Sequence, residues 1–323
     1  MRVVAVEEHF ITPMFAAGPG KAAVEGFRKR VGGDLLIDRL SEIGDKRVAE
    51  MDAAGIDLQV LSLNAPGVEQ LEPDDAIACA RDANDRLAGA VQRHPTRLAG
   101  FASLPISAPE AAAAELERCI RTLGFKGANI NGHSQGRYLD NPFFTPVLER
   151  AEALGVPIYL HPTVPPKAVA DILYGGFSDA VSAIFASGGW GWHIETAVHV
   201  LRMVLGGVFD RHPRLQVVIG HLGEGIPFML PRLNKNLPTR VTKLERSVAE
   251  YLRQNVNYTF GGFNFMPTFL NLLLEVGVER IMFSVDYPFC SMQESRNFLS
   301  CLPVSEADRE RISHGNAERL LRV

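Results

Sequence analysis

The 323-residue sequence lacks most of the features that mark secreted, membrane-spanning or nucleic-acid-binding proteins. No stretch approaches the roughly 20 apolar residues of a membrane-spanning helix, and the first residues lack the basic segment and cleavage site of a signal peptide. Lys and Arg number 33 against 37 acidic residues, and the net charge of -4 gives no general attraction to nucleic acid or anionic membranes. These absences predict a cytoplasmic protein whose partner is a small molecule.

Cysteine is also scarce, and the four thiols form no CxxC pair. The spacing predicts reduced thiols instead of a disulfide framework. These cysteines are Cys79, Cys119, Cys290 and Cys301.

Short apolar runs alternate with helix-like segments along nearly the whole chain. Eight runs have the continuous apolar character of strands that are buried on both faces. They are residues 2–9, 56–64, 97–105, 124–131, 156–162, 215–223, 256–262 and 280–288. Among the helix-like segments, residues 74–93 begin with Asp74 as a predicted N-cap after Pro73, and residues 110–123 end before Gly124.

Strands of this kind, alternating with helices, pair in parallel and have both sheet faces covered. Eight such units predict a (β/α)₈ barrel of the TIM type, formed as a single domain over residues 1–323. A doubly wound open sheet is the competing architecture, but no strand-to-helix turn contains GxGxxG. Residues 163–192, rich in Gly and Pro, are expected to form an insertion over the C-terminal face of the barrel.

Polar residues end several of the apolar strands, where the active site of such a barrel lies. Glu7 and His9 end the first strand and point the same way, whereas Glu8 points the other way. His161 and Asp286 end the fifth and eighth strands. Two imidazoles and two carboxylates predict a site for one divalent ion, Mn²⁺ or Zn²⁺. His221 ends the sixth strand, and Glu224 follows just beyond it.

Each of these residues also has a simpler interpretation. A single histidine in a buried strand is more often a hydrogen-bonded core residue than a ligand, and a carboxylate at a strand end is commonly solvated. Four strand ends that share such residues favour the metal site, because burying unpaired charges is costly. His193 lies beside Trp190, and this pair is expected either to contact a planar ligand or to pack within a lid. No role is assigned to His94, His133, His199, His212 and His314.

Several longer segments together resemble the amidohydrolase-related nonoxidative decarboxylases, and in particular the γ-resorcylate (2,6-dihydroxybenzoate) and 2,3-dihydroxybenzoate decarboxylases. The resemblance spans nearly the whole chain in the right order. The segments are "EEHF", "GFKGANING", "DNPFFTPVLERAEALGVPIYLHP", "ETAVHVLRMVLGGVFDRHPRL", "GHLGEGIPFML", "RIMFSVDYPF" and "GNAERLL".

The resemblance implies roles for particular residues. It makes Glu7, His9, His161 and Asp286 the metal ligands, and it makes Asp286, His221 and Glu224 the catalytic residues. Arg232 matches an arginine that family members contribute across a subunit interface, which implies a homodimer or homotetramer. The sequence departs from the family pattern at Tyr287, Cys290 and His193, where a substrate ring is expected, so Tyr287, His193 and Trp190 are predicted to bind the substrate.

The activity that the resemblance implies is metal-dependent, nonoxidative decarboxylation of an ortho-hydroxybenzoate to a phenol and CO₂, which makes the protein a carbon–carbon lyase. An ortho hydroxyl lets the ring carbon that carries the carboxylate take up a proton, and Asp286 is the expected donor. Two alternatives stay open. The same ligands suit a metal-dependent hydrolase of a lactone or amide, and a closed metal site suits a catalytically silent barrel that binds an aromatic acid.

Overall fold

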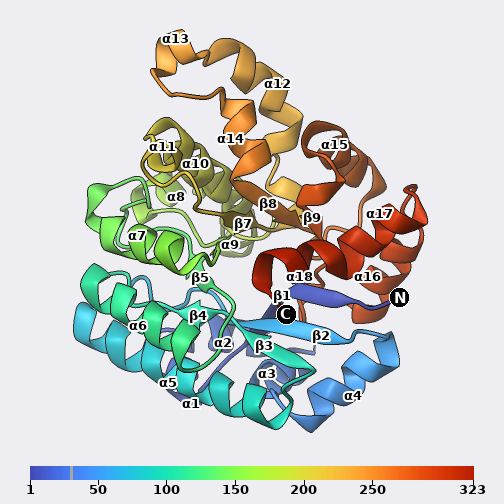
Figure 1. The fold of residues 1–323 in the computed structure, drawn as a ribbon. Coiled ribbons are helices and arrows are strands. Elements are labelled where there is room, and N and C mark those ends of the chain that lie inside the picture. Colours follow the sequence, from blue (N-terminus) through green and yellow to red (C-terminus); the bar gives the residue numbers. More distant parts are fainter. Residues whose placement is uncertain (30–31) are drawn as a thin grey trace.

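The computed structural model describes residues 1–29 and 32–323 of the chain. All strands among these residues are parallel to their neighbours (Figure 1). The strands are β1 (Val4–Phe10), β2 (Leu58–Leu63), β3 (Leu98–Gly100), β4 (Ala102–Ser103), β5 (Ala128–Asn131), β6 (Ile158–His161), β7 (Val217–Ile219), β8 (Val256–Thr259) and β9 (Ile281–Met282).

The strands follow one another in chain order around a barrel of the TIM type, but their ladder is not closed. A three-stranded sheet contains β1 to β3, and a six-stranded sheet contains β4 to β9. The third predicted strand is divided into β3 and β4 at Phe101, whose backbone N–H donates to the carbonyl of Leu61. At the other junction, the Val6 N–H donates to the carbonyl of Phe283, beyond the end of β9. Individual backbone hydrogen bonds therefore connect the two sheets where no ladder runs, and an isolated parallel bridge between Glu8 and Tyr287 adds to them at the second junction.

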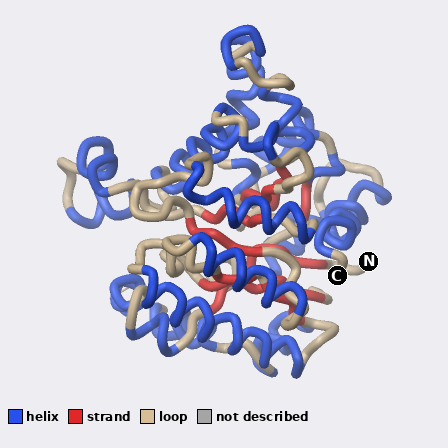
Figure 2. The backbone as a smooth tube through the Cα atoms, turned by 60° about the vertical axis from the view of Figure 1, so that its left-hand side comes forward, coloured by secondary structure: helices blue, strands red, loops and turns tan. Residues whose placement is uncertain are grey.

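Helices surround the strands on the outside, and the strands lie at the centre of the molecule (Figure 2). This is the arrangement that the alternating pattern predicts, with additional helices between β1 and β2. The helices are α1 (Pro13–Ala17), α2 (Lys21–Arg28), α3 (Gly33–Ser41), α4 (Asp45–Ala54), α5 (Pro73–Arg93), α6 (Pro109–Arg121), α7 (Thr145–Leu154), α8 (Lys167–Tyr174), α9 (Asp179–Ala186), α10 (Gly191–Leu205), α11 (Val208–Arg211), α12 (Ile226–Asn236), α13 (Thr239–Thr242), α14 (Val248–Gln254), α15 (Met266–Val276), α16 (Met292–Ser300), α17 (Glu306–Glu310) and α18 (Asn316–Leu321), with the short helices η1 (Pro142–Phe144), η2 (His221–Gly223), η3 (Val278–Arg280) and η4 (Arg311–Gly315).

The predicted start of α5 was wrong by two residues. Glu72, and not Asp74, occupies the N-cap position, and Pro73 is the first helical residue. Proline suits this position because its fixed φ matches the helix and its missing N–H would have had no helical partner. Asp74 and Asp75 therefore lie in the first turn, where their negative charge favours the helix.

Residues 163–192 form the helices α8 and α9 and lead into α10. This segment exposes several large apolar side chains, namely Val164, Ile172, Leu173, Phe177, Val181, Ile184 and Trp190. Among the described residues, no single helix has the length and apolar composition to cross a membrane, although the bent pair Lys167–Tyr174 and Asp179–Leu205 meets both criteria when its parts are taken together.

Two apolar cores hold the barrel together. The larger core lies between the strands and the surrounding helices. The smaller one joins side chains from strands all round the ring, so it fills the barrel interior, and Ala317 and Leu321 of α18 complete it. The N- and C-termini lie on the same side of the molecule in Figure 2, and an ion pair between Arg2 and Glu318 connects the segments next to them.

Candidate metal centre and active site

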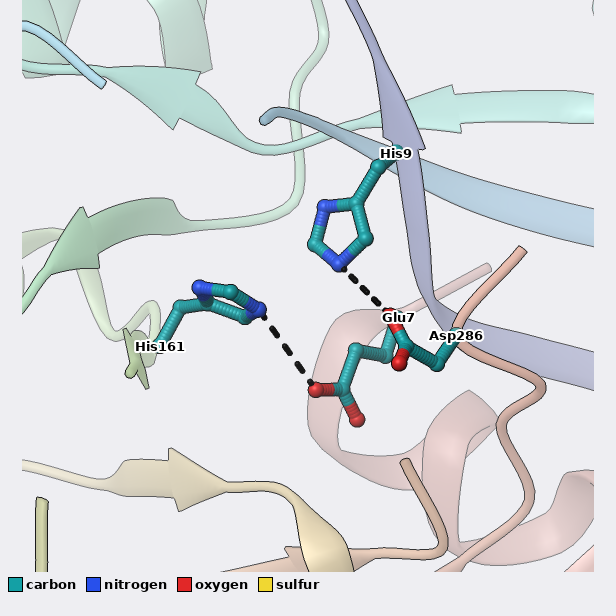
Figure 3. Close-up of side chains that lie close together, drawn as sticks. All are labelled: Glu7, His9, His161 and Asp286. Atoms are coloured by element: carbon teal, nitrogen blue, oxygen red, sulfur yellow. Dashed lines mark ion pairs between the residues drawn. The ribbon is translucent and has the colours of Figure 1, made fainter. Parts of the chain in front are cut away.

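Four of the predicted site residues converge at one end of the barrel (Figure 3). Glu7 and His9 come from β1, His161 ends β6, and Asp286 follows β9. Each offers one ligand atom, and these atoms all lie within 4.8 Å of one another. The Asp286 side chain is 17% exposed, whereas the other three are at most 5% exposed. Asp286 is therefore the member of the group that a ligand in the barrel mouth reaches.

A bulge in β1 aims two ligands into the barrel. Val4 and Val6 belong to the interior core, so simple alternation would point Glu7 outward. The register of β1 against β2 shifts between Ala5 and Glu8, where β1 has one residue more than its partner. A bulge of this kind re-aims the side chains that follow it. Glu7 and His9 consequently face the interior, and Glu8 faces outward.

Neighbouring strands fix the Glu7 carboxylate. The Thr259 hydroxyl donates to Glu7 Oε2 over 2.7 Å, and the Ser284 hydroxyl lies 3.4 Å from the same oxygen. A Cβ atom added to Gly220 would lie 2.5 Å from Glu7 Oε1, and one added to Gly261 would lie 2.8 Å from Glu7 Oε2. The two glycines therefore leave the space that the carboxylate occupies.

Three buried atoms of these four residues lack a hydrogen-bond partner among the described residues, namely Glu7 Oε1, His9 Nε2 and His161 Nδ1. His9 Nε2 instead lies 3.2 Å from Asp286 Oδ1, and His161 Nε2 lies 3.9 Å from Glu7 Oε1 (Figure 3). An orphaned carboxylate oxygen and an orphaned imidazole nitrogen are costly unless a cation is bound between them. Two nitrogen and two oxygen donors fit one Mn²⁺ or Zn²⁺ ion.

The protonation of the group agrees with this fit. Burial, together with the neighbouring His9 and His221, lowers the pKa of His161 well below its ordinary value, so its imidazole is neutral, as a metal ligand must be. Burial raises the pKa of Glu7 in the absence of a cation. A bound cation would offset that cost, because an opposite charge nearby favours the ionised carboxylate.

A second group consists of His221, Glu224 and His193 and lies beside the first. Glu224 bridges the two histidines: His221 Nδ1 lies 2.7 Å from Glu224 Oε1, and His193 Nδ1 lies 2.6 Å from Glu224 Oε2. His221 Nε2 lies 4.0 Å from Glu7 Oε1, so this imidazole faces the metal centre. The loop after β7 presents these side chains with unusual backbone angles, since His221 has φ +50° and Glu224 has φ +55°. Such angles in non-glycine residues are characteristic of functional sites.

His221 and Glu224 form a buried ion pair. Burial alone lowers the pKa of His221, but the carboxylates of Glu224 and Glu7 outweigh it and raise this pKa to about 10. Burial likewise raises the pKa of Glu224, but His221 and the hydrogen bond from His193 outweigh it, so the pKa is lowered. His221 can therefore act as a proton donor, and once deprotonated as an acceptor, beside a fixed anion.

Replacing His193 by phenylalanine removes the donor to Glu224 Oε2. We expect the free energy of unfolding to fall by about 1–3 kcal/mol, the cost of an unpaired buried polar group. We also expect kcat to fall about tenfold, because a looser Glu224 holds His221 less firmly; tenfold is about 1.4 kcal/mol of transition-state stabilisation. His314→Phe is the matched control, since it breaks a His–Glu pair with Glu318 on the outer helices. Equal kcat values for both variants would contradict the bridging role.

The remaining predicted site residues lie elsewhere. The Tyr287 hydroxyl donates to Glu50 of α4, and its ring lies under the Arg47 guanidinium, so Tyr287 is not among the side chains brought together around Glu7. Trp190 is 51% exposed at the start of α10. Arg232 is exposed on α12, and within residues 1–29 and 32–323 its side chain has no ion pair or hydrogen bond.

Sequence reasoning missed several residues that shape the site. Thr259 and Gly220 position Glu7, and the Phe263 ring lies edge-on to both His193 and His221, with centroids 5.0 and 5.2 Å away. Thr259 carried a usable signal, since it is a polar residue at the end of an apolar strand. The glycine and the phenylalanine carried none, because only the assembled barrel shows which side chains they meet.

A further buried carboxylate lies beside the neighbouring strand β5. Glu69 Oε1 accepts the Asn131 backbone N–H over 2.7 Å, while Glu69 Oε2 has no partner among the described residues. Burial raises the pKa of Glu69 from 4.5 to about 7. Between these two values the folded protein binds more protons than the unfolded chain, so its free energy of unfolding falls as the pH rises.

Replacing Glu69 by glutamine is expected to remove that loss. Between pH 5 and pH 8, the free energy of unfolding of the variant should rise relative to that of wild type by up to about 3 kcal/mol. The conversion is about 1.4 kcal/mol for each unit by which the pKa is raised. Urea unfolding at the two pH values measures this difference. If the difference in the free energy of unfolding between the two proteins is the same at both pH values, Glu69 ionises normally.

Comparison with known proteins gives relatives over the full chain. The sequence model of the amidohydrolase family matches residues 32–323. The γ-resorcylate decarboxylase of Rhizobium radiobacter is 40% identical over 99% of this chain and 98% of its own. The structure of 2,6-dihydroxybenzoate decarboxylase from Rhizobium superimposes with a TM-score of 0.90, at 36% identity over 100% of this chain and 99% of the other. Dihydroxybenzoic acid decarboxylase from Polaromonas sp. JS666, with bound manganese and the inhibitor 2-nitroresorcinol, has a TM-score of 0.91, at 38% identity over 99% and 97% of the two chains.

Proposed function

The chain belongs to the amidohydrolase family, and we propose that it is a metal-dependent, nonoxidative decarboxylase that converts a dihydroxybenzoate-type ortho-hydroxybenzoate to the corresponding phenol and CO₂. The observation that carries this proposal is the convergence of Glu7, His9, His161 and Asp286 beside the His221–Glu224 pair. Relatives over the full chain with this activity support it.

The four converging residues are proposed to hold one divalent cation, either Mn²⁺ or Zn²⁺. Manganese is bound in the Polaromonas relative, and two imidazoles with two carboxylates also suit zinc. When bound, the cation supplies positive charge that favours the phenolate form of the substrate. The orphaned atoms Glu7 Oε1 and His9 Nε2 support this assignment.

Asp286 is proposed to donate the proton that the ring carbon takes up before CO₂ leaves. The side chain is the most exposed of the four ligands, so a ring in the barrel mouth can reach it. His221 is proposed to bind or deprotonate a ring hydroxyl, with Glu224 fixing the imidazole through its Nδ1 atom. His193 supports Glu224 from the other side.

A homodimer or homotetramer is proposed as the assembly, with Arg232 reaching the site of a neighbouring subunit. Arg232 has no partner in its own described chain, and its neighbours Phe228 and Met229 on α12 are 77% and 45% exposed. Exposed apolar side chains in one place are typical of an interface. The cytoplasm is proposed as the compartment, because all four cysteines are free thiols.

A matched set of acids tests the proposal. We expect 2,6-dihydroxybenzoate, 2,3-dihydroxybenzoate or a related ortho-hydroxybenzoate to lose CO₂ in the presence of Mn²⁺, while 3,5-dihydroxybenzoate, which has no ortho hydroxyl, is unchanged. Chromatography of the phenol product measures the reaction. If none of the ortho-hydroxybenzoates is decarboxylated and a lactone is hydrolysed under the same conditions, the proposal is overturned in favour of a hydrolase.

A further inference from the structure

One buried carboxylate at the centre is not among the converging ligands. Glu8 lies between Glu7 and His9 on β1 and is 0% exposed, but its side chain faces the opposite side of the strand. There it lies among Gln59 of β2 and the segment that follows β9. A carboxylate buried in this way needs specific partners to offset its lost hydration.

The partners of Glu8 are the two backbone N–H groups on either side of Asp286. The Val285 N–H donates to Glu8 Oε1 over 2.9 Å, and the Tyr287 N–H donates to Glu8 Oε2 over 3.1 Å. The N–H of Asp286 itself donates to the Glu7 carbonyl over 3.0 Å. Three successive N–H groups are therefore bound by two successive residues of β1.

These hydrogen bonds, which we call the Glu8 clamp, hold Asp286 in a backbone conformation that a free chain rarely adopts. Asp286 has φ +66°, in the left-handed region that non-glycine residues seldom occupy without support. The conformation turns its carboxylate back toward His9 and Glu7 (Figure 3). In an extended backbone, successive side chains point to alternate sides. With such a backbone at residue 286, the Asp286 carboxylate would no longer point toward His9 and Glu7.

Neighbouring side chains hold the Glu8 carboxylate of this clamp in place. Gln59 Nε2 lies 3.5 Å from Glu8 Oε2, and Gln59 Oε1 lies 3.5 Å from a guanidinium nitrogen of the buried Arg47. Arg47 also donates to the His9 carbonyl over 2.7 Å and lies over the Tyr287 ring. The positive charge of Arg47 therefore balances Glu8 and ties β1 and the Asp286 segment to α4.

We propose that Glu8 is a positioning residue for the metal centre: it holds the segment Val285–Tyr287 so that the Asp286 carboxylate faces Glu7, His9 and His161. This inference rests on one part of the proposed function, the metal site. It does not depend on which aromatic acid is the substrate. It also explains why β1 contains two successive glutamates, since Glu7 faces the proposed cation and Glu8 fixes a proposed ligand in the segment that follows β9.

Replacing Glu8 by glutamine tests the proposal. The amide keeps the shape but presents one acceptor and one donor, so one of the two N–H groups meets an NH₂ group instead of an oxygen. We expect Mn²⁺ affinity, measured from the electron paramagnetic resonance signal of free Mn²⁺, to fall by about 10–100-fold, as when the support of a metal ligand is removed. Asp57→Asn is the matched control, because Asp57 accepts the Val3 N–H over 2.7 Å at the opposite end of the same strand.

The control separates positioning from general stability. We expect the metal-free melting temperature to fall in both variants, and by more in Glu8→Gln because Glu8 is buried whereas Asp57 is exposed, while Mn²⁺ affinity falls only in Glu8→Gln. Wild-type Mn²⁺ affinity in folded Glu8→Gln would overturn the proposal. If that variant does not fold, Glu8→Asp, which keeps the charge but is too short to reach both N–H groups, carries the same test with the same criterion. A wild-type protein that binds no Mn²⁺ would instead overturn the proposed function.

Discussion

Replacing Asp286 by asparagine is expected to lower kcat for decarboxylation by at least about 10³-fold, within the range that a positioned proton donor contributes. Asparagine has nearly the same shape and tolerates the left-handed φ of +66° at this position, so the backbone of the site is retained. The amide cannot take up and deliver the proton that the ring carbon needs. Phenol formation at saturating Mn²⁺ and substrate measures the loss.

The metal content of the Asp286→Asn variant decides how that result is interpreted. The introduced amide keeps an oxygen donor, and we expect the variant to bind Mn²⁺ with reduced affinity, so the assay needs Mn²⁺ well above the measured dissociation constant. A loss of turnover in metal-loaded protein assigns the proton to Asp286. Near-normal turnover in that protein would remove Asp286 from the proton transfer and leave it as a ligand alone.

Replacing Gly220 by alanine is expected to lower Mn²⁺ affinity by at least about 100-fold, at the upper end of what disturbing the surroundings of a metal ligand costs. The added Cβ atom would lie 2.5 Å from Glu7 Oε1 and 3.0 Å from Glu7 Cδ, so the carboxylate must move. Any such movement would also disturb the hydrogen bond that the Thr259 hydroxyl donates to Glu7 Oε2. Mn²⁺ titration and decarboxylation at fixed Mn²⁺ should show the same loss.

Gly26→Ala provides the matched control for this substitution. Gly26 lies within α2, and a Cβ atom added there would meet no atom within 4 Å. An alanine in a helix is favoured over glycine by roughly 0.5–1 kcal/mol, so this variant should be slightly more stable and bind Mn²⁺ normally. Normal Mn²⁺ binding by Gly220→Ala as well would show that Glu7 is not a ligand or that it has room to move.

The sequence predicted the barrel and the convergence of four polar residues at its mouth because both depend on local patterns. Continuous apolar strands that alternate with helices indicate a parallel sheet, and strand-end residues such as His161 and Asp286 meet at one rim whatever the details of packing. Alternation also separated Glu8 from its two neighbours. The bulge in β1 was not predictable, because it appears only in the register of β1 against β2.

Other features depend on contacts between distant residues, which a single sequence does not reveal. The resemblance implies that Tyr287 lies where a substrate ring is expected, and its contact with a substrate stays a prediction. Its ring packs under Arg47, a residue 240 positions earlier in the sequence, and no local pattern indicates this contact. The break between β3 and β4 arises because Phe101 bonds to β2 while Ala102 bonds to the segment before β5. The role of Arg232 in another subunit likewise stays a prediction, because it concerns a contact between chains.

The most direct test of the account is decarboxylation by protein that has been stripped of metal and then titrated with Mn²⁺. The account predicts that the stripped protein releases no CO₂ from 2,6-dihydroxybenzoate or its ortho-hydroxy relatives, and that activity rises in proportion to Mn²⁺ and saturates at one ion per chain. Activity that survives complete removal of metal, or protein with one bound ion per chain that decarboxylates none of these acids, would contradict it.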